Sequence, residues 1–384
     1  MKKSLFFTAA LFSAVVFGTL SLFAQGEAVA PNEAREAYTA QMGIYKDHLK
    51  QLRTLKEEYQ TASPEKKDEI KETYTPLLQE TAKLQKSLIP LAINAYQSSE
   101  AEDQDLLVFL LSMLDKMVAS TENYETAYEI AKAVDDAVPE EYSYLHAYAA
   151  YAAFNVMALD DAEAFYKHAK ETGGLDALKK QDPRGEMQIP AMITQVLPEY
   201  RKYWAEEQAA REKDADSDLP RVLLRTNKGD IVLELFLREA PESVGNFMTL
   251  VSQKYYDGVP FHRVLPHFMA QGGDPTGTGA GGPGYCIKDE CKKPGARKHF
   301  RGSLSMAKTA APDSGGSQFF LCFIPTSHLN GQHTVFGRVV EGMDVLSDLQ
   351  RINPEGRSTA APDKIIEAKI LRGEPTPFKK LREK

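Results

Sequence analysis

The sequence predicts a multidomain protein in which an all-α amino-terminal half is followed by a β-rich carboxy-terminal half. Residues 32–211 contain few glycines and repeat apolar residues at intervals of three and four, which is typical of helices. From about Leu219, short apolar or alternating runs are separated by Gly, Pro, Asn and Asp, as in a closed barrel or a sandwich of strands. A chain of 384 residues is long enough for two such domains.

The charge balance argues against polyanionic partners. The chain has 46 basic and 54 acidic residues and a formal net charge of −8, so neither nucleic acid nor an anionic membrane surface is an expected partner. The one basic stretch, Lys292 to Arg301, contains Pro and Gly and is predicted to be a solvated loop.

Residues 1–24 are typical of a secretory signal. Lys2 and Lys3 precede an uncharged apolar run that reaches about Ala24, which predicts export to the periplasm or another extracytoplasmic compartment. Leu22 stands where a small residue is expected before a cleavage position. Because no charge interrupts the run before Glu27, an uncleaved signal would be long enough to anchor the protein in a membrane.

The helical half contains two recognisable patterns. "SPEK", at 63–66, places a capping Ser before a Pro at the first helical position, so it predicts a hairpin of two long helices. "NYETAYEIAKAV" and "LDDAEAFYKHAKETGG" align with an offset of 35 residues, close to the tetratricopeptide repeat length. Residues 105–174 are therefore either tetratricopeptide-like helix pairs or part of an irregular bundle, and either arrangement leaves room for a protein partner.

A change in composition and in hydrophobic period marks the boundary between the halves. "WAEEQAAREKDADSDLP", from Trp204 to Pro220, loses its apolar period while charge accumulates, which predicts a helix end and a linker at 212–218. "RVLLRTNKGDIVLELF" then reads as a hairpin around residues 227–229, and Pro241 begins the one helix expected among the strands. Residues 373–384 are predicted to be a basic tail.

Three cysteines are too few for a disulfide scaffold. Cys286 and Cys291 are close enough within a glycine-flanked loop to form a bridge in an exported protein, or to act as a redox-sensing pair, and Cys322 reads as a buried thiol. The C-x4-C spacing lacks the second pair that a zinc site needs, so the bridge is favoured over a zinc site.

Other motifs lack the neighbouring residues that their usual function requires. "GTGAGG", at 277–282, matches a dinucleotide fingerprint in letters but opens no helix, so these glycines are expected to let a surface loop fold closely. Ser317 lies in G-G-S-Q and not in a nucleophile elbow. The spacing of the histidines does not require them to converge on a metal. These histidines are His262, His267, His299, His328 and His333.

The ordered set "FHRVLPHFMAQGGD", "GSLSMA", "GSQFF" and "HTVFG" resembles the cyclophilin-type peptidyl-prolyl isomerases over 219–372. The resemblance implies a closed antiparallel barrel of eight strands capped by two helices, with a groove on its outer face. It also implies proline-containing polypeptides as substrates and requires no cofactor or metal.

Carried over residue by residue, the resemblance makes Arg263 the catalytic cation. It implies that Gln271 holds the substrate backbone, that 307–309 pair with it as a strand, and that Gly279 gates a neighbouring pocket. The implied substrate-binding residues are His262, Phe268, Met269, Gln271, Gly279, Ala307, Lys308, Thr309, Gln318, Phe320, His328, Leu329 and His333. Of these, the proline ring is expected between Phe268, Met269, Phe320 and Leu329.

This residue set suits the rotation of an X-Pro amide, because no bond breaks and no nucleophile is needed. The twisted nitrogen regains its lone pair, so a guanidinium aimed at it stabilises the transition state more than either planar state. His328 stands where the family usually has a large aromatic residue, so sensitivity to cyclosporin is not predicted, and His267 is expected to lie outside the site. The alternative function is a proline-peptide-binding chaperone or scaffold module with little catalysis.

Overall fold

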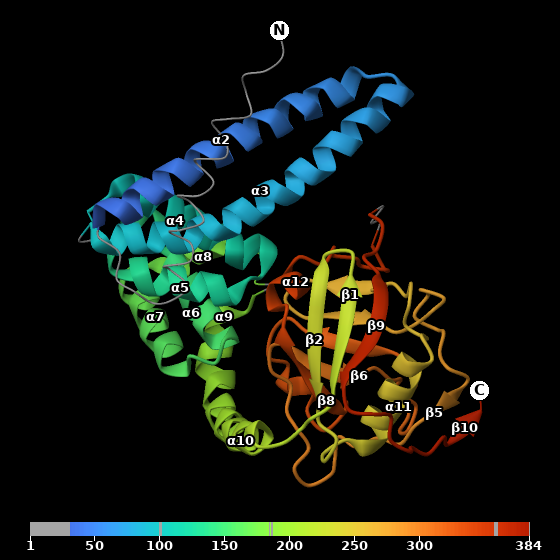
Figure 1. Ribbon diagram of the computed structural model, residues 1–384. Helices are drawn as coiled ribbons and strands as arrows, with labels where there is room; N and C mark the ends of the chain where they lie inside the picture. Colours follow the sequence, from blue (N-terminus) through green and yellow to red (C-terminus); the bar gives the residue numbers. More distant parts are fainter. Residues whose placement is uncertain (1–30, 100–101, 184, 186, 357–359, 384) are drawn as a thin grey trace. The chain divides into compact units, whose positions relative to one another are not determined.

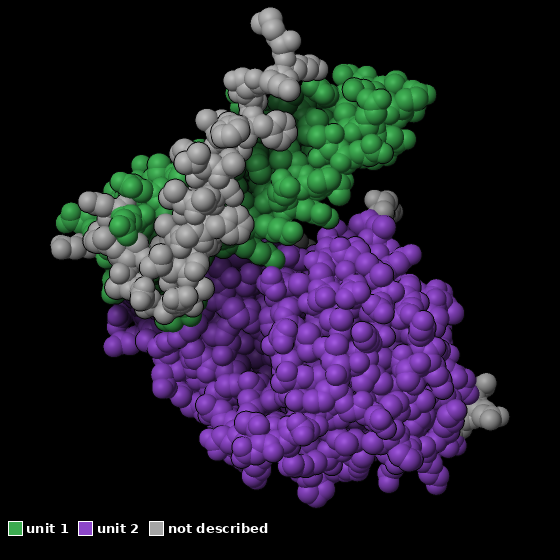
Figure 2. All heavy atoms as spheres, viewed as in Figure 1, with its two compact units in different colours: residues 1–115, 129–139 green, residues 116–128, 140–384 purple. Residues whose placement is uncertain are grey.

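The computed structural model describes residues 31–99, 102–183, 185, 187–356 and 360–383, and the chain divides into two compact units (Figures 1 and 2). The first unit holds the described residues up to 115 together with 129–139, and the second holds 116–128 and the chain from 140 onward. The predicted signal segment, residues 1–24, lies outside the described residues. No helix within those residues is both long and apolar enough to cross a membrane.

The first unit is built on a long helical hairpin. Helix α2 (Pro31–Thr61) and helix α3 (Pro64–Ser98) lie side by side (Figure 1), followed by α4 (Gln104–Lys116). Ser63 caps α3 by accepting a hydrogen bond from the Lys66 amide at 3.4 Å, with Pro64 at the first helical position. The predicted break at "SPEK" is therefore confirmed.

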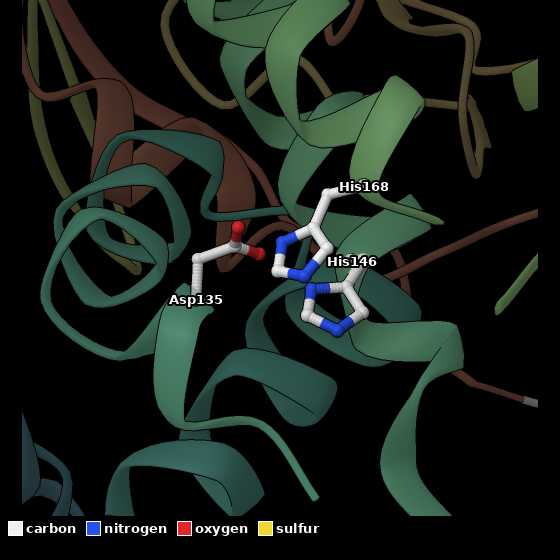
Figure 3. Close-up of side chains that lie close together, drawn as sticks. All are labelled: Asp135, His146 and His168. Carbon is white, nitrogen blue, oxygen red and sulfur yellow. The ribbon is translucent and has the colours of Figure 1, made fainter. Parts of the chain in front are cut away.

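The second unit contains the remaining helices, apart from residues 129–139, which hold the end of α5 and all of η2 and belong to the first unit. Its central helix, α6, is buried along its whole length because its side chains are mainly Ala and Tyr. The rings of His146 on α6 and His168 on α7 have their centroids 4.0 Å apart (Figure 3). The tetratricopeptide-like arrangement of 105–174 stays a prediction. The helices between α4 and the sheet are η1 (Met117–Thr121), α5 (Tyr124–Val134), η2 (Asp135–Ala137), η3 (Glu140–Tyr142), α6 (Tyr144–Asn155), α7 (Leu159–Glu171), α8 (Gly174–Gln181), α9 (Ile189–Ala191), η4 (Met192–Val196) and α10 (Leu197–Ala215).

Helix α10 continues through most of the predicted linker and packs on the carboxy-terminal region of the same unit. Arg297 is almost fully buried, and its guanidinium bonds to Glu207 and Asp214 of α10 at 3.0 and 2.8 Å, and to Glu239 at 3.2 Å. A buried guanidinium requires such partners, since an uncompensated buried charge is strongly destabilising. Residues 212–215 are therefore the end of a docked helix.

The carboxy-terminal region is one antiparallel sheet of eight strands, in the order β3-β4-β7-β6-β8-β2-β1-β9 (Figure 1). The strands are β1 (Arg221–Thr226), β2 (Gly229–Leu235), β3 (Arg263–Leu265), β4 (Met269–Gly272), β6 (Ser303–Met306), β7 (Phe319–Cys322), β8 (Val335–Glu341) and β9 (Ile365–Arg372). Helix α11 (Pro241–Ser252) and helix α12 (Met343–Ser347) both contribute side chains to its core.

The sheet is curled but open, so the closed barrel implied by the resemblance is a correction to the fold prediction. Within the described chain no strand ladder joins β3 to β9. Three backbone bonds cross the gap instead. They run from the Gly258 amide to the Ile365 carbonyl at 2.7 Å, from the Ile365 amide to the Val259 carbonyl at 2.9 Å and from the Phe261 amide to the Asp363 carbonyl at 2.9 Å. Pro266 directly follows β3 and has no amide proton, so it cannot donate to a continuation of this ladder.

The residues predicted as a basic tail are folded onto the sheet domain. Strand β10 (Arg382–Glu383) pairs with β5 (Tyr285–Cys286), and the ring of Phe378 lies 5.8 Å from that of Tyr285. A Cβ added to Gly245 of α11 would meet the Thr376 carbonyl at 2.6 Å, so the tail lies directly on this helix. Glycine at 245 permits that close approach.

We expect Phe378→Ala to lower the free energy of unfolding by about 1–2 kcal/mol, because the half-buried ring packs against the main core. Urea unfolding followed by circular dichroism measures the change. Glu374→Ala, an exposed position in the same tail, is the matched control. Equal midpoints for Phe378→Ala and the wild type would contradict the packing described.

Candidate active site

The predicted catalytic cation lies on the outer face of the sheet. Arg263 of β3 is paired with Gln271 of β4, which is paired with Phe320 of β7, so the three side chains project from the same face. The Arg263 guanidinium carbon lies 5.8 Å from the centre of the Phe268 ring, and Nη1 lies 3.9 Å from Met269 Sδ. None of the described carboxylates forms an ion pair with Arg263, so its charge is available to a ligand.

A cluster of apolar side chains adjoins this cation. Met269 and Phe320 are buried together with Cys322, and other residues pack against them from the surrounding strands and loops. The His328 ring lies at the exposed rim, 5.8 Å from the Phe268 ring. The residues packed against the buried three are Leu265, Phe268, Ala307 and Leu329.

Two histidines hold Phe320 in place. The fully buried His299 ring is nearly parallel to the Phe320 ring, with centroids 5.9 Å apart, and its two nitrogens lie 2.9 Å from Asn330 Oδ1 and Ser305 Oγ. His333 meets Phe320 edge-on at 5.5 Å, and its Nδ1 lies 3.0 Å from the Met306 carbonyl. Burial lowers the pKa of His299 to about 4, so this ring is neutral at pH 7.

A chain of side-chain amides links the cation face to the glycine-rich loop. Gln271 Nε2 donates to Gln318 Oε1 at 2.9 Å, and Gln318 Nε2 donates to the carbonyls of Gly279 and Gly281, both at 2.9 Å. These contacts fix the orientation of both glutamines, so the remaining lone pairs and amide protons of Gln271 have a defined direction.

Asp274 organises the glycine-rich loop from inside. Its fully buried carboxylate accepts hydrogen bonds from the amides of Thr276, Thr278, Gly279 and Gly281, at 2.7 to 3.1 Å. Burial alone would raise the pKa of Asp274, but the bonds from Thr276, Gly281 and Gly279 outweigh it and lower the pKa to about 2. A Cβ at Gly281 would lie 2.0 Å from Asp274 Oδ1, so only glycine fits there.

A pocket of about 430 Å³ lies beside the linked side chains of Gln271 and Gln318. Its wall includes six of the predicted groove residues, which are Gln271, Gly279, Ala307, Lys308, Thr309 and Gln318. Lys308 Nζ lies 3.3 Å from Asp289 Oδ2, so its charge is already paired.

His262 is buried beside the glycine-rich loop. Neither ring nitrogen has a hydrogen-bond partner among the described residues, and a Cβ at Gly279 would lie 3.6 Å from its Nε2. Burial lowers the pKa of His262 and outweighs the nearby Asp274 carboxylate, which raises it. The ring is therefore a neutral group that can donate or accept one hydrogen bond.

Six predicted groove residues thus line one pocket, and Phe268, Met269, Phe320 and Leu329 belong to the adjoining apolar cluster, whereas the predicted bridge between Cys286 and Cys291 is not formed. Cys286 and Cys291 are both free thiols. Cys286 is buried in the strand that pairs with β10, and the Cys291 thiol donates to the Gly331 carbonyl at 3.3 Å. The buried thiols also give no support to a redox-sensing loop.

Sequence reasoning missed the roles of Asp274 and His299. An aspartate followed by alternating Thr and Gly is a local signal for a loop folded around a carboxylate, and it was present in "GGDPTGTGAGG". No comparable signal marks His299, because its partners Ser305, Phe320 and Asn330 become neighbours only through strand pairing and loop closure.

Comparison with known proteins matches residues 221–370 to the family described as cyclophilin type peptidyl-prolyl cis-trans isomerase/CLD. A peptidyl-prolyl cis-trans isomerase of Helicobacter pylori is 53% identical over 130 residues, which are 33% of this chain and 78% of that protein. One from Synechococcus elongatus is 43% identical over 155 residues, which are 40% of this chain and 97% of that protein.

Similarity also extends to a fungal protein and to a solved structure. A peptidyl-prolyl cis-trans isomerase-like 1 of Gibberella zeae is 42% identical over 157 residues, covering 40% of this chain and 96% of its own. The crystal structure of a cyclophilin type isomerase from Cryptosporidium parvum matches 40% of this chain and 99% of its own, with 32% identity and a TM-score of 0.38.

We expect the free energy of unfolding to fall by about 3 kcal/mol between pH 6.5 and pH 4 through His299 alone. Its pKa is lower in the folded chain, so the stabilisation is complete above pH 6.5 and is lost as the pH falls towards 4. Urea unfolding at several pH values, followed by Trp204 fluorescence, reports it, because Trp204 packs against Phe300. His299→Gln should flatten this slope and His48→Gln should not. Identical slopes for the wild type and His299→Gln would contradict the assignment.

Proposed function

This chain belongs to the family of cyclophilin-type peptidyl-prolyl cis-trans isomerases, and we propose that Arg263 catalyses the rotation of X-Pro bonds in extracytoplasmic polypeptides. The observation that carries the proposal is the position of Arg263, an unneutralised cation beside the Phe268 ring and the Met269 sulfur. A cation beside apolar side chains suits a reaction in which the prolyl nitrogen accepts a hydrogen bond only in the transition state.

Rotation of the X-Pro amide passes through a twisted state without conjugation, against a barrier of about 18–20 kcal/mol. In that state the prolyl nitrogen has a localised lone pair, which the Arg263 guanidinium can meet with a hydrogen bond. A hydrogen bond to a charged group is worth about 1.5–3 kcal/mol, or roughly tenfold to a hundredfold in rate. The planar cis and trans states offer no such lone pair, so the bond favours the transition state.

The other groups of the site position the substrate. Met269, Phe320, Phe268 and Leu329 form an apolar cluster against which a proline ring, which carries no donor of its own, would pack. Gln271, oriented by Gln318, is placed to bind the backbone beside the ring. The pocket beside Gln271 and Gln318 would receive the side chain of a substrate residue near the proline.

Export is supported by the composition of residues 1–24, in which two lysines precede an apolar run. An exported isomerase would act on chains that fold outside the cytoplasm, where X-Pro isomerisation is slow enough to limit folding. We further propose that the helical first unit binds a protein partner, which is supported by exposed apolar side chains on its hairpin, Ile44, Leu49 and Leu78.

Arg263→Ala is expected to lower kcat/KM for an X-Pro peptide by about tenfold to a hundredfold, because the transition state loses one charge-assisted hydrogen bond. A protease-coupled peptide assay measures the rate. Arg225→Ala, which removes an exposed arginine of β1, is the matched control and should keep the wild-type rate. Wild-type activity in Arg263→Ala would refute the mechanism, and peptide binding without rate enhancement in the wild type would identify a binding module instead.

We expect the full chain, expressed in a Gram-negative bacterium, to be recovered from the periplasm with its first residue near Gln25. Intact-mass spectrometry of the fractions gives both results. A chain lacking residues 2–24 should stay in the cytoplasm. Recovery of the uncleaved chain from the cytoplasm would contradict export, and recovery from the membrane with an intact amino terminus would show an anchor.

A further inference from the structure

The turn between β3 and β4 carries part of the active-site wall. Leu265 is paired with Met269, so Pro266, His267 and Phe268 form the turn. His267 has a φ of 52°, in the left-handed region that residues other than glycine rarely adopt. Such a conformation persists only where the surroundings hold it.

A carboxylate from the helical part of the second unit holds this turn. Glu122 Oε2 accepts a hydrogen bond from the His267 amide at 2.7 Å, across 145 positions of sequence. Glu122 is only 2% exposed, so this charge-assisted bond is shielded from water. The next residue after the bonded amide is Phe268, whose ring lies beside the Arg263 guanidinium.

Glu122 is itself fixed in place. Its Oε1 accepts from Arg351 Nε at 3.0 Å and from Arg351 Nη2 at 2.8 Å, so two charge-assisted bonds meet at one oxygen. The Arg351 guanidinium lies 4.3 Å from the centre of the Phe323 ring, and Ser347 Oγ donates to the Glu122 carbonyl at 3.0 Å. The carboxylate therefore cannot reorient without breaking these contacts.

The His267 ring is bound to the same segment. Its Nδ1 lies 3.1 Å from the Tyr124 hydroxyl and 3.4 Å from the Tyr151 hydroxyl, and both tyrosines are fully buried. Backbone and side chain of the turn are thus both attached to helical residues that lie outside the matched family region of 221–370.

We propose that Glu122 is a positioning residue for the isomerase site, holding the β3–β4 turn so that Phe268 and Met269 face Arg263 in the geometry that catalysis needs. The inference rests on the proposed function of Arg263 and adds that the helical segment 116–128 sets the catalytic rate. Without the carboxylate, the strained His267 backbone relaxes and moves the pocket wall relative to the guanidinium. Because a misplacement of about 1 Å costs up to about a hundredfold, we expect a loss of about tenfold.

The test is the catalysed cis–trans exchange rate at saturating X-Pro peptide, measured by NMR on the full chain. Glu122→Ala should lower this rate about tenfold. Glu122→Met/Arg351→Met should do the same, and it replaces the buried ion pair by apolar side chains of similar volume, a change that folded proteins often tolerate. This double variant decides the question if Glu122→Ala does not fold. Glu122→Gln/Arg351→Met, whose amide oxygen can accept from the His267 amide while no guanidinium faces the amide nitrogen, should recover most of the rate.

Glu125→Ala is the matched control. Glu125 lies on the same segment and bonds to buried Arg301 at 2.8 and 2.9 Å, but it does not contact the turn. Its removal should leave the exchange rate within about twofold of the wild type. The rate is expressed per folded molecule, so a variant that only lowers stability should also keep the wild-type value. A wild-type rate in the double variant, or an equal loss in Glu125→Ala, would overturn the inference. Absence of exchange in both wild type and Arg263→Ala would instead reject the proposed function.

Discussion

Strands β3, β4 and β7 alternate their side chains between two faces, and the site depends on this alternation. Val264, Ala270 and Leu321 point into the core beneath α11, so their chain neighbours must point outward. Strand pairing then places Arg263 beside Gln271, and Gln271 beside Phe320. A one-residue slip in any of these pairings would bury the cation and expose the core.

The outward residues suit the site because the inner core and the supporting contacts keep them still. Phe320 is held by two histidine rings, Gln271 by Gln318, and the turn before Met269 by a carboxylate from the helical segment. An isomerase that forms no covalent bond has only geometry and electrostatics with which to favour the twisted amide. In the proposed mechanism, the main task of the fold is therefore to hold one guanidinium rigidly against one apolar cluster.

Local patterns of strand alternation and helix capping allowed the β-rich half and the long α2–α3 hairpin to be predicted, and the family resemblance supplied the candidate site residues. The disulfide failed, since proximity in sequence does not bring the thiols of Cys286 and Cys291 together. Helix α10 continues to Ala215, beyond residue 211 where the helical domain was expected to end. Arg297 forms ion pairs with Glu207 and Asp214 of this helix, and such contacts between residues distant in sequence could not be predicted. That His267 lies outside the substrate site stays a prediction, whereas its hydrogen bond to Glu122 could not be predicted because the two residues are 145 positions apart.

The most direct test of the account follows the Met269 methyl group by NMR while an X-Pro peptide is titrated into the full chain. We expect its resonance to shift saturably, and exchange cross-peaks between the cis and trans peptide to appear over the same range of protein-to-peptide ratios. Catalysed exchange with no change at Met269 would place the reaction elsewhere on the molecule. A saturable shift without exchange would show that the pocket binds proline but does not catalyse its rotation.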